Sequence, residues 1–172
     1  YQISYSQSLS EDFIREFKDK VFWAWISKCQ SLSEDFIREF KDKLNIDKSK
    51  LWQYWSVEDK KKYIIDDTPY NVEQDNSGYY VSAYKSTLKG GRSWYKLSMS
   101  YEVGNTYTSH CNCNSDDLAS HGLSAWTKEN ALDFHSSGDL YRVKIYLEDL
   151  GCIINDDNFK IRCFKQTFME KI

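Results

Sequence analysis

The chain has 172 residues and carries 23 Lys and Arg against 26 Asp and Glu, so its formal net charge is −3. Its longest block of like charge is Lys60-Lys61-Lys62, which argues against a basic footprint for nucleic acid or a polybasic membrane patch. No apolar run approaches the roughly 20 residues that span a bilayer, so we expect no membrane span.

The first element in chain order is a repeated segment. Residues 30–43 match residues 7–20 letter for letter, 23 residues downstream. A degenerate third copy follows at the same spacing and begins near Ser56. In this copy Asp59 and Lys60 replace two apolar residues of the earlier copies. We therefore expect its outer face to be solvent-exposed, as in a terminal capping repeat.

Each full copy is predicted to form a short amphipathic helix. In the second copy Ser33 is placed to act as the N-cap, and Phe36, Phe40 and Leu44 form one apolar stripe. The aromatic segment 21–29 is expected to form a second short helix. Helices this short are unstable alone in water, so we expect them to stack as a solenoid.

The rest of the chain is predicted to be a small domain, which makes the fold class α+β. We expect residues 1–66 to form the solenoid-like helical segment and residues 67–172 a mostly antiparallel β domain with one helix. Alternation and aromatic content predict strands and one helix, with a loop at 71–78. The strands are 79–85, 94–98, 123–126, 141–147, 152–154 and 159–164. Segment 101–107 is expected to carry a turn at Gly104-Asn105, and Thr127 is expected to cap a helix over 128–134. In the last strand Phe159, Ile161 and Cys163 are expected to face inward.

The repeat carries a resemblance. The motif Leu-Ser-Glu-Asp-Phe-Ile-Arg-Glu-Phe-Lys-Asp-Lys with a following Trp-x-x-Ile-Ser segment resembles the 23-residue repeats of giant-virus (mimivirus-type) proteins. The segment 55–67 and the region after it resemble the C-terminal domain of the same proteins. Relatives often read Gly-Leu-His where this chain has Gly122-Leu123-Ser124. The resemblance implies a location in the infected host cytoplasm or the virion, and it implies no activity. The register of the repeat itself, in which Ile3-Ser4 matches Ile26-Ser27, leads us to expect further repeats upstream of Tyr1.

One group of residues could bind a metal ion. His110, Cys111, Cys113 and His121 are zinc-capable ligands close together in sequence. The Cys-x-Cys spacing departs from the usual knuckle, so the alternative is a loop with free thiols and no cofactor. A nucleophilic pair is a further alternative, with Cys111 or Cys113 beside His121 or His135.

Two other patterns have plain structural interpretations. The chain has five Cys, an odd number with irregular spacing, which favours reduced thiols in an intracellular setting over a disulfide framework. Segment 89–93, Lys-Gly-Gly-Arg-Ser, could suggest a phosphate cradle, but the strand expected after it favours a hairpin turn.

The aromatic residues of the repeat region are the main functional candidates. Trp23, Trp25, Trp52 and Trp55 could line a groove for a protein partner, or they could fill the space between short helices. We therefore expect a non-enzymatic module for protein interaction or self-association, or a virion-associated structural protein. The alternative is an ADP-ribosyltransferase-like or nucleotide-binding enzyme domain in residues 68–172. A deep pocket lined by Arg, Glu and His would favour the enzyme.

Overall fold

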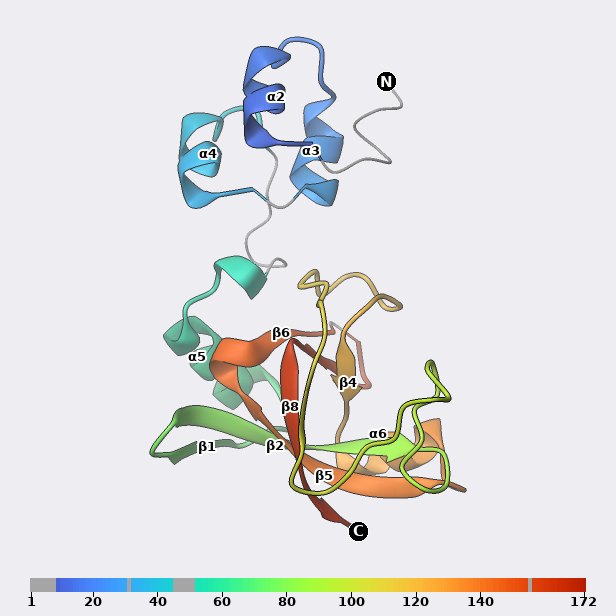
Figure 1. Cartoon of the computed structure of the whole chain (residues 1–172). Coiled ribbons are helices and arrows are strands. Elements are labelled where there is room, and N and C mark those ends of the chain that lie inside the picture. The colour runs from blue at the N-terminus through green and yellow to red at the C-terminus, as the bar shows by residue number, and fades with distance from the viewer. Residues whose placement is uncertain (1–8, 31, 45–51, 155) are drawn as a thin grey trace. The chain divides into compact units, whose positions relative to one another are not determined.

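The computed structural model describes residues 9–30, 32–44, 52–154 and 156–172 (Figure 1). Contacts within the chain divide it into two compact units, Tyr1–Asp47 and Lys48–Ile172. The sequence pattern places a boundary after residue 66, whereas the contacts place the third copy of the repeat in the second unit.

Three short helices make up the described part of the first unit: α2 (Glu11–Glu16), α3 (Trp23–Cys29) and α4 (Glu34–Glu39). Both N-caps have the geometry expected from the sequence. Ser10 Oγ accepts a hydrogen bond from the N–H of Phe13, and Ser33 Oγ accepts one from the N–H of Phe36. That these helices belong to a longer solenoid stays a prediction.

Aromatic packing connects α3 to α4. The Trp23 ring lies 5.0 Å from the Phe40 ring and 6.5 Å from the Phe36 ring, centroid to centroid. Phe36 is fully buried, and the Arg15 guanidinium lies over its ring at 4.9 Å. Arg15 also pairs with Glu39 at 2.8 Å, which links α2 to α4. These contacts supply the support that helices of six or seven residues need.

The second unit combines antiparallel sheets with helices, which confirms the mixed fold expected from the sequence. A five-stranded sheet has the order β1-β2-β5-β8-β3, with strands β1 (Val72–Asp75), β2 (Gly78–Thr87), β5 (Asp139–Tyr146), β8 (Lys165–Lys171) and β3 (Thr106–Thr108). A three-stranded sheet has the order β4-β7-β6, with strands β4 (Leu123–Ala125), β7 (Ile161–Cys163) and β6 (Leu150–Ile153). The helices are α5 (Val57–Asp67) and α6 (Lys128–Phe134), with 3-10 turns η1 (Trp52–Tyr54) and η2 (Leu147–Asp149).

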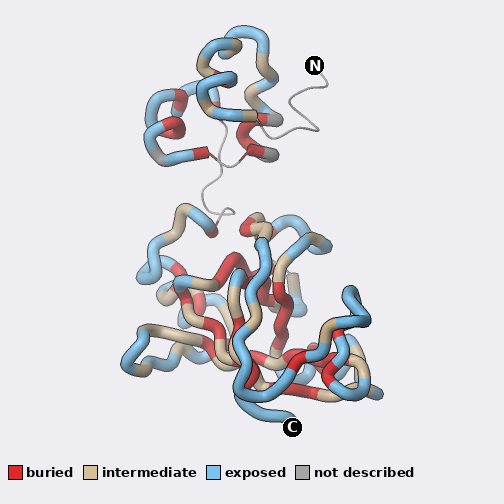
Figure 2. Tube along the Cα trace, in the orientation of Figure 1, coloured by how far each residue is buried: buried red, intermediate tan, exposed pale blue. Residues whose placement is uncertain are grey.

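Both sheets contribute to one core (Figure 2). Val81 and Val143 from the large sheet and Ile161 from the small sheet are all fully buried in it. The sheets are joined where Tyr84 and Trp126 exchange two backbone hydrogen bonds, each 2.8 Å long. These bonds hold the start of α6 beside β2.

The third copy of the repeat is part of this core. Ile64 of this copy is buried in it, and so is Trp52, which precedes the copy. The prediction of a solvent-exposed face is wrong at Lys60, which is only 6% exposed. Its ammonium group donates hydrogen bonds to the carbonyl oxygens of Leu147 at 3.1 Å and Leu150 at 2.6 Å. The buried face of α5 therefore packs against η2 and β6.

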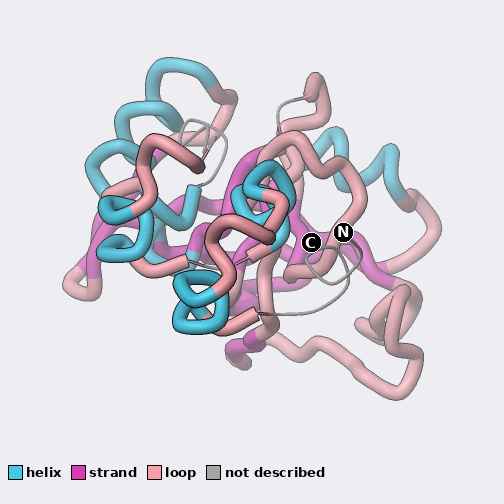
Figure 3. The backbone as a smooth tube through the Cα atoms, turned by 90° about the horizontal axis from the view of Figure 1, so that it is seen from above, coloured by secondary structure: helices cyan, strands magenta, loops and turns pink. Residues whose placement is uncertain are grey.

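Several strands differ from the expectation. Residues 72–75 form β1 where a loop is expected, because β2 turns back on them in a tight hairpin. Residues 165–171 form β8, which alternation alone does not reveal. Residues 94–98 form no strand and lie in the long loop before β3 (Figure 3). In that loop Tyr95 is 89% exposed, so it has no core to face.

The last hairpin follows the expectation in part. Ile161 and Cys163 are fully buried, as alternation predicts. Phe159 is only partly buried, because it lies in the turn with a positive φ of 47°. Arg162, which alternation places outside, is fully buried, because β7 is the middle strand of its sheet and is covered on both faces.

Candidate functional site

The candidate metal ligands do not converge. Cys113 is 3% exposed and Cys111 is half-buried, whereas His110 and His121 are both exposed. Within the described ranges, no group of three or more His, Cys, Asp or Glu is arranged to hold a metal ion. The zinc interpretation of the His110–His121 loop therefore gains no support from the geometry.

The two cysteines of this loop instead lie near buried cations. The Sγ of Cys111 lies over Gly151, where an added Cβ would come within 2.2 Å of it. The pKa of the Cys113 thiol is lowered by the hydrogen bond from Cys111 and by the charges of Lys60 and Arg162. The Arg162 guanidinium donates to the Asn114 carbonyl oxygen at 2.6 Å, so it also holds the loop on β7.

The candidate nucleophilic pairs are not formed either. The His121 ring lies 3.4 Å from the hydroxyl of Ser120. His135 follows α6, where its ring packs edge-on against Trp94 at 4.3 Å. Among the described residues, no hydrogen bond joins a cysteine to a histidine. The thiols therefore lack the oriented base that a nucleophilic cysteine needs.

The tryptophans expected to bind a partner fall into both units. Trp23 packs within the first unit, and the side chain of Trp25 lies outside the described residues. In the second unit Trp52 is 1% exposed and belongs to the core. Trp55 stacks on it with centroids 4.6 Å apart and is only partly buried. Of these four tryptophans, Trp55 lines one of the described cavities.

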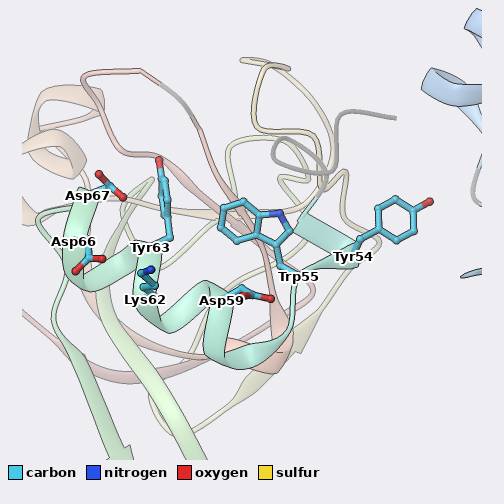
Figure 4. Close-up of a pocket in the computed structure, with 7 residues that line it drawn as sticks. All are labelled: Tyr54, Trp55, Asp59, Lys62, Tyr63, Asp66 and Asp67. Atoms are coloured by element: carbon cyan, nitrogen blue, oxygen red, sulfur yellow. The ribbon is translucent and has the colours of Figure 1, made fainter. Parts of the chain in front are cut away.

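That cavity is an open groove of about 480 Å³ beside α5, called the α5 groove below (Figure 4). Its lining residues are Tyr54, Trp55, Asp59, Lys62, Tyr63, Asp66 and Asp67. Helical spacing explains the set, because positions 59, 62, 63, 66 and 67 are three or four residues apart along one face of α5. Tyr54, the last residue of η1, and Trp55, which follows it, add the two other aromatic residues of the lining.

Trp55 and Tyr63 form the aromatic wall of the α5 groove. Their rings meet edge to face with centroids 5.5 Å apart, and Figure 4 shows the Trp55 indole beside the Tyr63 ring. Trp55 is fixed from behind by Trp52, which also contacts Tyr63 at 5.1 Å. The groove therefore presents aromatic faces whose positions are set by the core.

The acidic residues of the α5 groove have two different roles. Asp59 caps α5, because its carboxylate accepts from the Ser56 hydroxyl at 2.6 Å and from the Ser56 N–H at 3.2 Å. These hydrogen bonds hold the pKa of Asp59 below its usual value. Asp66 and Asp67 are exposed, and they form no ion pair with any described residue.

The position of Asp66 and Asp67 is electrostatically unfavourable. Both lie in the last turn of α5, where the backbone carbonyl groups give a helix its partial negative charge, and that turn has no basic residue. Burial and then the charge of Asp67 raise the pKa of Tyr63. Lys62 is the one basic residue in the described lining, against three Asp, so the lining has a net negative charge.

The sequence pattern indicates Trp55 as a binding residue but does not indicate the acidic residues beside it. The available signal was a pair of Asp residues in the last turn of a predicted helix, where Lys or Arg is favoured. The chemistry of the α5 groove is thus aromatic and anionic. Such a surface binds the guanidinium or ammonium group of a ligand through ion pairs and ring faces.

Comparisons with known proteins identify no relative: no family model, no curated protein and no solved structure matches the chain. Over the described residues, no helix is long and apolar enough to cross a membrane.

Proposed function

We propose that the protein is a non-enzymatic interaction module and that the α5 groove binds an arginine- or lysine-bearing segment of a protein partner. The observation that supports this most is the end of α5, where Asp66 and Asp67 line the groove with Trp55 and Tyr63 and form no ion pair with a described residue. One cationic side chain can contact an aromatic face and a carboxylate there together.

The groove implies modest affinity for a single cationic residue. A cation over an exposed aromatic ring contributes about 0.5–1 kcal/mol. An exposed ion pair contributes about 0.2–1 kcal/mol. Several neighbouring cations on one segment would add to this, so a basic peptide is the suitable ligand. A second copy of this chain could also provide the cation.

Peptide binding tests the proposal. Fluorescence anisotropy of a labelled hexa-arginine peptide is measured with the full chain at physiological salt. We expect the double substitution Asp66→Asn and Asp67→Asn to weaken binding by about tenfold, because two ion pairs are lost. A hexa-citrulline peptide, which has the same shape without the charge, should not bind.

The matched control is Asp133→Asn on α6, which removes an exposed carboxylate from the other helix of the unit. It should leave the affinity unchanged. Equal weakening by Asp133→Asn would show that the peptide responds only to net charge, and the groove assignment would be abandoned.

The setting of this function follows from the repeat. The resemblance of residues 7–20 and 30–43 to giant-virus repeats supports, as part of this proposal, a viral repeat protein that acts in the host cytoplasm or the virion. The ADP-ribosyltransferase-like alternative stays a prediction, which a rise in melting temperature with NAD would favour. None of the described cavities brings Arg, Glu and His together, so no specific observation favours it.

A further inference from the structure

Lys85 occupies an inward position on the central strand β2. The strand alternates, so that Val81, Ala83, Lys85 and Thr87 share the face that is buried against the core. Lys85 is 9% exposed, which is rare for a lysine without an acidic partner. An ammonium group at this depth needs a specific explanation.

Among the described residues, no acidic side chain pairs with the Lys85 ammonium. It donates a hydrogen bond to the carbonyl oxygen of Ser124 on β4 at 2.7 Å, and it lies 5.3 Å from the centre of the Tyr101 ring. Of the ion pairs among described residues, none includes Lys85. Burial lowers the pKa of Lys85 to about 8, and the titratable groups that act on it are the thiol of Cys163 and the ammonium of Lys160.

Lys85 lines a small enclosed cavity between β2, β4, α6 and the loop before β3. The free space is about 50 Å³. The lining residues are Lys85, Ser86, Thr87, Ser93, Trp94, Tyr95, Tyr101, Gly122, Leu123, Ser124, Trp126 and Phe134. A water molecule occupies roughly 30 Å³ of liquid, so the cavity suits a group of carboxylate size and not a nucleotide.

Aromatic rings form the outer walls of this cavity. The Trp126 ring stacks on Phe134 at 4.8 Å, and the Trp94 ring meets Phe134 edge-on at 6.2 Å. Trp94 is 39% exposed and so connects the cavity with the protein surface. A ligand can thus place a flat apolar part against Trp94 while its polar head reaches Lys85.

We propose that this cavity binds the carboxylate group of a small aromatic acid, with Lys85 as its counter-ion. A buried cation is costly unless it is paired, and a single ammonium group neutralises one negative charge. A monoanionic carboxylate matches that charge and the size of the cavity. Ser93 and Ser124 line the same space, and a serine hydroxyl can donate a hydrogen bond to a carboxylate oxygen.

Benzoate and benzamide, which have the same shape and differ in charge, test this proposal. The full chain is titrated with each compound, and the backbone and indole N–H signals are followed by NMR. We expect saturable shifts at Trp94, Trp126 and β4 with benzoate, and at least about tenfold weaker binding of benzamide, because it lacks the charge.

Proton linkage gives a second readout. Bound benzoate should raise the pKa of Lys85, so near pH 8 binding should take up protons from the buffer. Calorimetry in buffers with different ionisation enthalpies measures this uptake. No proton uptake together with equal affinity for benzamide would overturn the proposal.

Two substitutions complete the test. Lys85→Met keeps the approximate length of the side chain and removes its charge. It should abolish benzoate binding, while the NMR spectrum shows that the variant is still folded. If Lys85→Met fails to fold, Trp94→Ala tests the site instead, because Trp94 is 39% exposed and its loss should leave the core intact. It should weaken benzoate binding, and unchanged binding would count against the site.

Discussion

Three buried cations of the second unit are the residues that sequence patterns describe least well. Lys60, Lys85 and Arg162 are each less than one tenth exposed. Alternation places Arg162 on the outside of its strand, and a mostly polar third copy suggests solvent around Lys60. Each is buried because its ammonium or guanidinium reaches backbone carbonyl groups of distant segments. Such long-range hydrogen bonds leave no local pattern in the sequence.

The burial of Lys85 makes a pH-dependent prediction. Its pKa is about 8 in the folded protein and 10.5 as the ordinary value, so the unfolded chain binds more protons between these pH values. The free-energy penalty of the buried charge is fully present below pH 8 and is relieved as the pH rises toward 10.5. The wild type should therefore gain up to about 3 kcal/mol relative to Lys85→Met over this range.

Urea unfolding of both proteins across this range measures the difference. Comparing the two proteins cancels the titration of the other lysines, tyrosines and thiols. If the difference in unfolding free energy between the two proteins stays constant with pH, the pKa of Lys85 is not lowered by burial, and the prediction is wrong.

At the scale of elements, the sequence pattern predicts the short helices of the repeat but not the strands at the edges of the sheet. Helices α2 and α4 begin where their serine caps indicate, because this signal is local, whereas α3 begins after Phe22 without a side-chain cap. Strand β1 is polar and lies at a sheet edge, so its sequence resembles a loop. The α5 groove also depends on tertiary packing, since Trp55 must stack on Trp52 before it can face Tyr63.

The packing of α5 can be tested at Lys60. Lys60→Met leaves the carbonyl oxygens of Leu147 and Leu150 without their donor, so we expect a loss of about 2–4 kcal/mol in unfolding free energy. Lys62→Met on the exposed face of the same helix should change the stability by less than about 0.5 kcal/mol. Urea denaturation compares them, and equal effects would show that Lys60 does not support α5.

At the scale of the whole molecule, the two units differ in how they are held together. The first unit relies on rings and ion pairs between very short helices, whereas the second has a core shared by two sheets. The sequence predicted both kinds of structure. The repeat copies place the boundary after residue 66, whereas the contacts within the chain divide it after Asp47. Similar residues in the third copy serve a different core, because Ile64 is buried in the core that the two sheets share.

Truncation separates the two boundaries. A chain that begins at Lys48 should keep the melting transition of the second unit, because its core is complete. A chain that begins at residue 67 loses Trp52, Lys60 and Ile64. Loss of one large core side chain costs about 3–5 kcal/mol, and a domain has only about 5–15 kcal/mol in total. We expect this shorter chain to be largely unfolded, and calorimetry showing two equally stable fragments would contradict the boundary after Asp47.

The central claim is that the α5 groove receives a cationic segment, and NMR of the full chain with hexa-arginine peptide tests it most directly. We predict saturable shifts of the Trp55 indole N–H and of the amides of Tyr63, Asp66 and Asp67. Shifts spread over α6 and other acidic surfaces, with the Trp55 signal unmoved, would contradict the claim.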